Sequence, residues 1–407
     1  MRLPDDSLAI SLFGYGLTTK ALAEKFGPCT VYDDKVTEPF TDERGNRLKP
    51  PGDFDPRRSL LEIPSPGMPP EHPLIASAKH LVSEYDVFAE TMPFSVWISG
   101  TNGKTTTTQM TTHLLADKGA LSGGNIGTPL ARLDAEAPIW VLETSSFTLH
   151  YTQRAVPNLY ALLPVSPDHL SWHGSMEAYI EAKLRPVAKM QEGEAAILPN
   201  TLIPHVKTAA YLIGYDDAYD LAAYFGIDTA KIRFKGGFLL DAVIAMAVDA
   251  LLYGRRDYDR INAFVLDPHR QEELLDTQGR LWVNDTKATN IDATLAALEA
   301  YKGKRVHLVL GGDDKGVDLE PLFEALQRYD VTIYAIGSNE ARLVACAETF
   351  GIACTPCSDL ATAVAEMAKL HTAESVALLS PAAASLDQFS SYAERGNTFK
   401  SLVSKLS

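Results

Sequence analysis

The segment with the clearest chemical signature lies near residue 100, where an apolar run is followed by Gly-Thr-Asn-Gly-Lys-Thr at 100–105. A strand, a glycine-rich turn and the start of a helix, in that order, can bind phosphate, because main-chain N–H groups and the positive end of the helix face the anion. Lys104 would place a point charge on the outer phosphates, and the Thr105 hydroxyl would hold a magnesium ion. The segment therefore predicts a nucleotide phosphate site.

This loop differs from the commonest phosphate-binding pattern, in which the first glycine would stand at position 98 rather than at Gly100. A simpler alternative is a glycine-rich turn that only begins a helix. Such a turn rarely needs two glycines, a lysine and a threonine in this order after an apolar strand, so the phosphate site is favoured.

Two further apolar runs of this region end in residues that can bind cations. Glu143 follows the run 139–142, and His169 follows the next one. An acid at a strand end beside a phosphate loop can coordinate or orient magnesium. A lone histidine is more often an ordinary surface group, but the repetition of the pattern favours function. Lys183 lies in a predicted helix (175–189), where the local sequence indicates a solvated side chain.

A second turn, Gly14-Tyr15-Gly16, lies between a predicted strand and a predicted helix near the start of the chain. With an acid after the next strand, it resembles a dinucleotide-binding fingerprint whose third glycine is replaced by Thr19. Thr18 and Thr19 at the helix start could hold a phosphate, and Asp33 or Asp34 could accept from a ribose or a base. A turn that binds nothing remains an alternative. An NAD-dependent oxidoreductase would need the missing glycine.

A proline-rich segment (64–70) follows a short apolar run and contains Ser65 and Gly67. If the run is a strand of the same parallel sheet, this segment lies at the carboxyl edge, where ligands bind in such folds. A plain proline-rich turn explains the segment equally well. The preceding residues, 35–58, are polar and rich in Pro and Gly, which predicts loop and short irregular structure.

The last third of the chain repeats the pattern of apolar strand, polar or glycine-rich end, and helix. Four strand ends carry Asp, Lys, Thr or Ser, which predicts a second ligand crevice. Helix capping is the alternative, since Ser, Thr, Asp and Asn favour helix starts. Capping explains Ser338 well, but it explains Lys287 and Lys315 poorly.

Composition restricts the class of protein. The 407 residues carry a formal net charge of −15, which argues against nonspecific binding to nucleic acid or to an anionic membrane surface. Four cysteines are too few for a disulfide framework, and the single C-x-x-C pair, Cys354 and Cys357, is interpreted as reduced thiols. The longest apolar stretch (238–253) contains two aspartates, which suits a buried helix better than a membrane span. With no targeting segment visible, the prediction is a cytoplasmic protein.

These patterns together predict an α/β protein of three domains. The predicted domains are a Rossmann-like domain at 1–93, a central P-loop ATPase-type α/β domain at 94–266 and a Rossmann-like α/β domain at 267–407. The predicted strands are 8–13, 29–32, 60–63, 96–98, 139–142, 159–165, 281–283, 306–310, 331–336 and 375–379. The predicted helices are 17–26, 109–118, 175–189, 238–253 and 291–301.

A set of motifs in this order resembles the Mur ligase family across essentially the whole chain. The motifs are Gly-Thr-Asn-Gly-Lys-Thr (100–105), Gly-Asn-Ile-Gly (124–127), Glu-Thr-Ser-Ser-Phe (143–147), Asp-His-Leu (168–170), Glu-Ala-Lys (181–183) and His-Arg (269–270). Two longer stretches, 284–290 and 380–389, resemble the members that add D-glutamate.

The resemblance implies an ATP-dependent amide ligase that uses magnesium and acts as a monomer. ATP would phosphorylate the carboxylate of UDP-N-acetylmuramoyl-L-alanine, and D-glutamate would attack the acyl phosphate. The product would be a peptidoglycan precursor. Catalysis would depend mainly on positioning and charge neutralisation.

The resemblance also implies residue roles. The ATP-binding residues would be Gly100, Asn102, Gly103, Lys104, Thr105, Thr106, Arg270, Asp285 and Lys287. Magnesium would be held by Thr105, Glu143, His169 and a carbamylated Lys183, and the catalytic set would be Lys104, Glu143, His169 and Lys183. Substrate would be bound by Leu17, Thr18, Asp33, Ser65, Gly67 and Asn125, and D-glutamate by Thr289, Lys315, Ser385 and Tyr392.

The chain departs from the family pattern at three places. Phe238-Leu239 stands where a His-Asn pair usually contacts adenine, Thr286 replaces a serine, and Tyr392 replaces a phenylalanine. A related ligase that adds another amino acid or acts on folate, and a nonenzymatic nucleotide-binding regulator, remain the alternatives.

Overall fold

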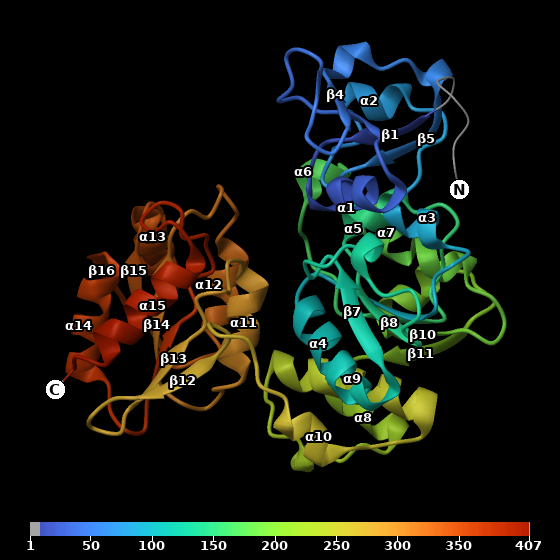
Figure 1. Ribbon diagram of the computed structural model, residues 1–407. Coiled ribbons are helices and arrows are strands. Elements are labelled where there is room, and N and C mark those ends of the chain that lie inside the picture. The colour runs from blue at the N-terminus through green and yellow to red at the C-terminus, as the bar shows by residue number, and fades with distance from the viewer. Residues whose placement is uncertain (1–8, 407) are drawn as a thin grey trace. The chain divides into compact units, whose positions relative to one another are not determined.

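The computed structural model describes residues 9–406, which form two compact units (Figure 1). Unit 1 comprises the chain up to Arg233 together with Leu239–Phe264. Unit 2 comprises Phe234–Phe238 and the chain from Val265 onward. Each predicted domain range contains one sheet, so the architecture is α/β with three sheets. The boundaries at 93/94 and 266/267 stay predictions.

The first sheet of unit 1 has the order β3-β4-β2-β1-β5. Its strands are β1 (Ala9–Phe13), β2 (Thr30–Tyr32), β3 (Phe40–Thr41), β4 (Arg47–Lys49) and β5 (Ser59–Pro64). The helices beside them are α1 (Leu17–Phe26), α2 (Pro73–Ser77) and α3 (Glu84–Phe88). All neighbours are parallel except the β3–β4 pair. The prediction of irregular structure at 35–58 missed β3 and β4. A three-residue strand with one buried side chain, Leu48, shows no alternation to detect.

The second sheet of unit 1 is entirely parallel, with the order β11-β10-β9-β6-β8-β7. Its strands are β6 (Phe94–Ser99), β7 (Ala120–Gly124), β8 (Ile139–Glu143), β9 (Leu159–Leu162), β10 (Ala195–Pro199) and β11 (Tyr211–Tyr215). The main helices are α4 (Lys104–Leu114), α5 (Ser146–Tyr151), α6 (Leu170–His173), α7 (Met176–Lys189), α8 (Ala218–Phe225), α9 (Gly237–Tyr253) and α10 (Tyr258–Ala263). Since β6 lies between β8 and β9, the carboxyl ends of these three strands meet at one edge.

Helix α4 begins five residues before the predicted start at 109. Gly103 adopts a left-handed conformation with φ of 84°, so the loop closes there and the helix begins at Lys104. The threonine run that looked like part of the loop is therefore the first turns of the helix, and three of its side chains are fully buried.

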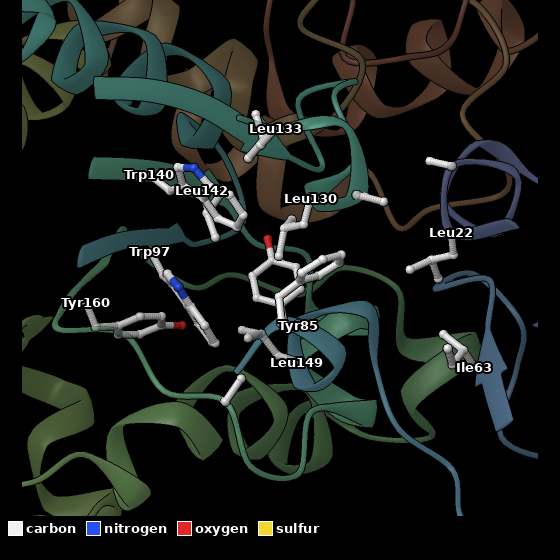
Figure 2. Packing of buried hydrophobic residues seen from close by; sticks show 14 of the residues in the cluster. Leu22, Ile63, Tyr85, Trp97, Leu130, Leu133, Trp140, Leu142, Leu149 and Tyr160 are labelled. Atoms are coloured by element: carbon white, nitrogen blue, oxygen red, sulfur yellow. The ribbon is translucent and has the colours of Figure 1, made fainter. Parts of the chain in front are cut away.

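The two sheets of unit 1 share one hydrophobic core. Figure 2 shows Tyr85 of α3 lying between Trp97 of β6 on one side and Leu22 and Ile63 on the other. The rings of Tyr85 and Trp97 meet edge to face at 4.8 Å. The segment that connects β5 to β6 and contains α3 is thus part of the packed interior.

Unit 2 contains the third sheet, with the order β12-β13-β17-β14-β15-β16. Its strands are β12 (Glu272–Leu275), β13 (Leu281–Asn284), β14 (Val306–Gly311), β15 (Val331–Ile336), β16 (Cys354–Ser358) and β17 (Val376–Leu379). Its helices are α11 (Ile291–Glu299), α12 (Glu320–Leu326), α13 (Glu340–Phe350), α14 (Leu360–Leu370) and α15 (Tyr392–Val403). Only the β12–β13 pair is antiparallel. Two apolar clusters pack against this sheet.

In residues 9–406, no helix combines the length and apolar character needed to cross a membrane. The predicted apolar stretch at 238–253 is the helix α9, and its Asp241 and Asp249 are both buried.

Candidate functional site

The phosphate loop connects β6 to α4 and requires glycine at both of its glycine positions. Gly100 has a φ of 141°, and a Cβ atom there would come within 2.5 Å of the Leu163 Cβ. A Cβ on Gly103 would collide with the carboxylate of Asp241. The Lys104 Nζ atom donates to the carbonyls of Gly100 (3.1 Å) and Thr101 (2.8 Å), so the ammonium lies over the loop. Asn102 lies in the loop, Thr105 and Thr106 lie in the first turn of α4, and the Thr106 hydroxyl is buried.

Glu143 at the end of β8 is buried beside this loop. Its Oε1 atom accepts a hydrogen bond from the Asn125 amide at 2.6 Å, and its main-chain carbonyl accepts one from the Tyr85 hydroxyl at 3.1 Å. Among the described residues, its Oε2 atom has no hydrogen-bond partner. A buried carboxylate oxygen without a partner is costly, so this position is suited to a cation.

Lys183 of α7 is buried against the same loop, so the interpretation of a solvated lysine is wrong. The side chain is 1% exposed, and its Nζ atom donates to the Gly100 carbonyl at 2.7 Å. The Tyr179 ring centroid lies 4.6 Å from Nζ. Burial, reinforced by the positive charge of Lys104, holds the pKa of Lys183 well below its usual range. A neutral amine is the form that can react with carbon dioxide, so the environment fits a modified lysine.

His169 lies in the loop after β9 and is the first residue before α6. Its backbone is left-handed, with φ of 53°, and its ring lies 4.6 Å from that of Phe147. The His169 Nε2 atom is 3.4 Å from the Asp168 carboxylate, and both side chains are partly exposed.

The predicted magnesium residues all belong to elements that meet at the carboxyl edge of the central sheet. Glu143 ends β8, Lys183 contacts the loop after β6, Thr105 is the second residue of α4 and His169 follows β9. In the described part of the chain, no three His, Cys, Asp or Glu side chains form a group that could hold a metal ion. A site here would depend on Glu143, whose Oε2 atom has no hydrogen-bond partner among the described residues, and on carbamylation of Lys183, which stays a prediction.

The turn of the first sheet lies at the carboxyl ends of β1, β2 and β5. The Asp33 carboxylate accepts main-chain hydrogen bonds from Tyr15 (2.7 Å) and Lys35 (2.9 Å). The buried Ser65 hydroxyl, which has no partner among residues 9–406, is so close to Gly14 that a Cβ there would approach it to 2.8 Å. Leu17 and Gly67 are exposed and Thr18 is half-buried. The possibility that Thr19 holds a phosphate is wrong, because its buried hydroxyl donates to the Gly14 carbonyl at 2.7 Å.

Two aromatic residues that sequence reasoning missed hold the loop that contains Ser65 and Gly67. Trp172 of α6 donates its indole N–H to the Gly67 carbonyl at 3.2 Å, and the Tyr151 hydroxyl of α5 donates to the Met68 carbonyl at 2.6 Å. Their rings are 5.9 Å apart. The sequence signal that could have identified them is their position, because Tyr151 lies in the segment after β8 and Trp172 in the segment after β9.

Most of the predicted residues of unit 2 lie on three loops that main-chain hydrogen bonds join, whereas Arg270 precedes β12 and Tyr392 begins α15. We call them the aspartate loop (284–290), the glycine loop (311–316) and the serine loop (380–385). Ala382 N–H donates to the Ala288 carbonyl at 3.1 Å, and Asp313 N–H donates to the Ala384 carbonyl at 3.0 Å. The structure therefore brings together the loops that carry Thr289, Lys315 and Ser385.

The aspartate loop also carries Asp285 and Lys287, which are assigned to the nucleotide together with Arg270, a residue just before β12. Asp285 is buried and accepts from the Ser380 hydroxyl (2.8 Å) and the Gln271 N–H (3.2 Å), and burial raises its pKa to about 7. The Arg270 Nε atom is buried and has no partner in the described part of the chain. The Lys287 ammonium lies 5.6 Å from the centroid of the Tyr392 ring.

Comparison with known proteins places this geometry in a family. The protein-family model for the Mur ligase middle domain matches residues 98–213 of this sequence, and the family model for the Mur ligase glutamate ligase domain matches residues 269–383. A UDP-N-acetylmuramoylalanine–D-glutamate ligase from Campylobacter jejuni is 54% identical over 403 residues, which cover 98% of this chain and 100% of that protein. The chain belongs to the Mur ligase family.

Other Mur ligases support this assignment. A protein of the same name from Helicobacter pylori is 46% identical over 421 residues, covering 98% of this chain and 100% of the relative. Among solved structures, the MurF ligase from Thermotoga maritima in complex with ADP has a TM-score of 0.59 at 16% identity, covering 97% of this chain and 93% of that one. At that identity, the likeness shows that this Mur ligase shares the fold.

Proposed function

We propose that the chain is an ATP-dependent ligase that joins D-glutamate to UDP-N-acetylmuramoyl-L-alanine in peptidoglycan precursor synthesis, acting as a monomer. The observation that carries this proposal is the identity of 54%, over essentially the full length of both chains, to a relative named for that reaction. The phosphate loop and the buried Glu143 and Lys183 support the use of ATP, and the ADP complex of the MurF structure agrees with it.

The proposed reaction has two chemical steps. The alanyl carboxylate oxygen attacks the γ-phosphorus of ATP, ADP leaves and an acyl phosphate forms. The D-glutamate nitrogen then attacks the acyl carbon, the carbon–oxygen bond to phosphate breaks, inorganic phosphate leaves and the amine releases a proton. Both steps redistribute charge on phosphate oxygens, so fixed positive charge and positioning supply the catalysis.

The residues of the phosphate loop have distinct proposed roles. The N–H groups of the loop cradle the phosphates, and Lys104 places its charge on the transferred group. Glu143, Thr105, His169 and carbamylated Lys183 hold magnesium, which supplies further positive charge to the phosphates when bound. Asn125 restrains the Glu143 carboxylate through its hydrogen bond and contacts the substrate.

The remaining proposed roles belong to residues near the first sheet and the third sheet. Leu17, Thr18, Asp33, Ser65 and Gly67 surround the uridine diphosphate at the first sheet. Arg270, Asp285 and Lys287 reach the nucleotide, and Thr289, Lys315, Ser385 and Tyr392 bind D-glutamate, with Lys315 as a point charge for a carboxylate.

A phosphate-release assay tests the function. The protein is incubated with ATP, magnesium and UDP-N-acetylmuramoyl-L-alanine, and with D-glutamate, L-glutamate, L-alanine or a diamino acid in turn. We expect rapid release only with D-glutamate. A preference for another amino acid would indicate a different ligase of the family, and ATP binding without release under any combination would indicate a regulator.

Two lysine variants test the assignment of the phosphate loop in this assay. Lys104→Ala should lower phosphate release by roughly 100- to 1,000-fold, the usual effect of removing one electrostatic contact to the transition state. Lys118→Ala, a control just beyond α4, should leave the rate unchanged. Equal rates for Lys104→Ala and the wild type would contradict the assignment of the phosphate loop.

A further inference from the structure

Arg395 of α15 is a buried cation that joins two of the three loops of unit 2. The residue is 1% exposed. Its Nε atom donates to the Thr286 hydroxyl at 2.9 Å, and Nη2 donates to the carbonyls of Thr286 (3.0 Å) and Ala383 (3.1 Å). Nη1 lies 3.4 Å from the Ala384 carbonyl. The rigid guanidinium fork therefore fixes the aspartate loop against the serine loop.

All of these acceptors are neutral. No carboxylate of residues 9–406 lies within ion-pair distance of Arg395. Burial lowers the pKa of Arg395 to about 10, and the more distant Asp387 opposes that change. The group is therefore charged at neutral pH. A buried charge without a counter-ion in contact is expensive for the folded state, so its retention calls for an explanation beyond packing.

Arg280 provides a contrast within the same unit. It is also a buried arginine, but its Nε atom is 2.7 Å from the Asp276 carboxylate. It also donates to the carbonyls of Ala368 and His371. Arg280 thus has the counter-ion that Arg395 lacks.

We propose that Arg395 is a positioning residue of the amino-acid site and that its charge, which no carboxylate in contact neutralises, favours an amino acid with an acidic side chain. This inference rests on the proposed function, because Thr289 and Ser385 lie on the two loops that Arg395 joins. An acidic amino acid brings two carboxylates. A fixed charge in the protein interior acts on them over several ångströms, since the surroundings screen it less than water does.

The test measures discrimination between D-glutamate and D-glutamine, which have nearly the same shape but differ in side-chain charge. The readouts are the KM for D-glutamate, the inhibition constant of D-glutamine, and the KM for ATP. The variants are Arg395→Met and Arg395→Gln, which remove the charge, and Arg395→Lys, which keeps it. Arg280→Met is the matched control. Thermal unfolding of each variant reports folding.

For the uncharged variants, we expect the preference for D-glutamate over D-glutamine to fall about tenfold or more, the effect of losing one charge interaction in the protein interior. The KM for ATP should stay within about twofold of the wild-type value, and Arg395→Lys should keep most of the preference. Arg280→Met should lower the unfolding temperature without changing the preference. A purely structural role would weaken both ligands equally and leave their ratio unchanged.

Two results would overturn the proposal. One is an unchanged preference in a folded uncharged variant. The other, which decides the matter even if neither uncharged variant folds, is loss of the preference in folded Arg395→Lys.

Failure of the proposed function is distinguishable from failure of this inference. If the wild type releases phosphate with another amino acid, the proposed function fails, and the Arg395 variants are then measured with that amino acid and its closest isostere of different charge. An acidic acceptor with the same charge dependence would support the inference, and a neutral acceptor would overturn it.

Discussion

The Lys183 amine lies 2.7 Å from the Gly100 carbonyl and is almost inaccessible to solvent. Lys104 contacts the same carbonyl, so two lysines converge on one end of the phosphate loop. Burial and mutual repulsion favour a neutral Lys183 amine, and conversion to a carbamate would replace the repulsion by attraction. The local charge pattern thus favours an anion at this position.

Substitution of Lys183 tests this interpretation. Lys183→Ala should lower turnover by roughly 100-fold or more, as for other losses of a charged group at a phosphoryl-transfer site. Added bicarbonate should not restore it, because no amine remains to react. Steady-state phosphate release gives the rates, with Lys189→Ala of the same helix as the control. Turnover close to wild type in Lys183→Ala would exclude the carbamate.

Glu84 gives a prediction for the pH dependence of stability. Burial raises its pKa from 4.5 to about 7, against the effect of main-chain hydrogen bonds from Ala131 and Leu130. As pH rises from about 4.5 to about 7, the unfolded chain releases the Glu84 proton while the folded chain holds it. The contribution of this group to the free energy of unfolding is therefore full below this window and is lost as pH rises through it.

Glu84→Gln removes this titration and keeps an oxygen that can accept from Ala131 N–H. We expect the variant to unfold at a higher temperature than the wild type at pH 8, and at nearly the same temperature at pH 4. Thermal unfolding at both pH values measures the difference, and Glu90→Gln at an exposed position is the control. A variant that is less stable at pH 8 would show that the buried carboxylate is ionised and favourably bound.

Helices α5 and α6 connect two sheet edges of unit 1. Trp172 and Tyr151 hold the loop after β5, while His169 and Phe147 of the same segments, which follow β9 and β8, are in ring contact with each other. The proposed uridine diphosphate site and the proposed metal site therefore share their supporting elements. A shift of α6 would change both.

Trp172→Phe keeps an aromatic ring and removes the donor to the Gly67 carbonyl. The KM for the UDP-linked substrate should rise roughly three- to tenfold, the effect of one lost hydrogen bond, with the KM for ATP unchanged. Tyr151→Phe should act in the same direction through Met68, and Tyr219→Phe, at an exposed position, should have no effect. Initial rates at varied substrate concentration measure both constants. A parallel rise in the KM for ATP would assign α6 to the whole site rather than to the loop.

The two units have separate hydrophobic cores, each formed around its own sheets. Burial of apolar surface supplies most of the favourable free energy of folding, so separate cores predict separate cooperative transitions. We expect calorimetry of the full chain to show two transitions. Arg280→Met should lower only the transition of unit 2, and Glu84→Gln at pH 8 should raise only that of unit 1. A single transition that both substitutions shift would show that the units unfold together.

Features with a local cause could be predicted from the sequence. Helix α1 and strand β15 have their predicted bounds, because apolar period, glycine turns and capping residues act over a few neighbouring positions. Strands β4 and β12 were not predicted because β4 has only three residues and β12, Glu-Glu-Leu-Leu, shows no alternation of polar and apolar residue types. The phosphate loop was evident because its glycines are required by backbone geometry at the loop itself.

Features that depend on contacts between distant segments could not be predicted from the sequence. Lys183 looks like a surface lysine in its own helix, and it is buried only because α7 packs against α5 and the phosphate loop. Arg395 is an ordinary helical arginine until the sheet order sets β13 beside β17 and so joins the loops that follow them. Residue types and their spacing in the sequence determined which chemistry each strand end can perform. Only the tertiary structure decided which strand ends meet and which charged side chains are buried, because both depend on packing between residues more than eighty positions apart.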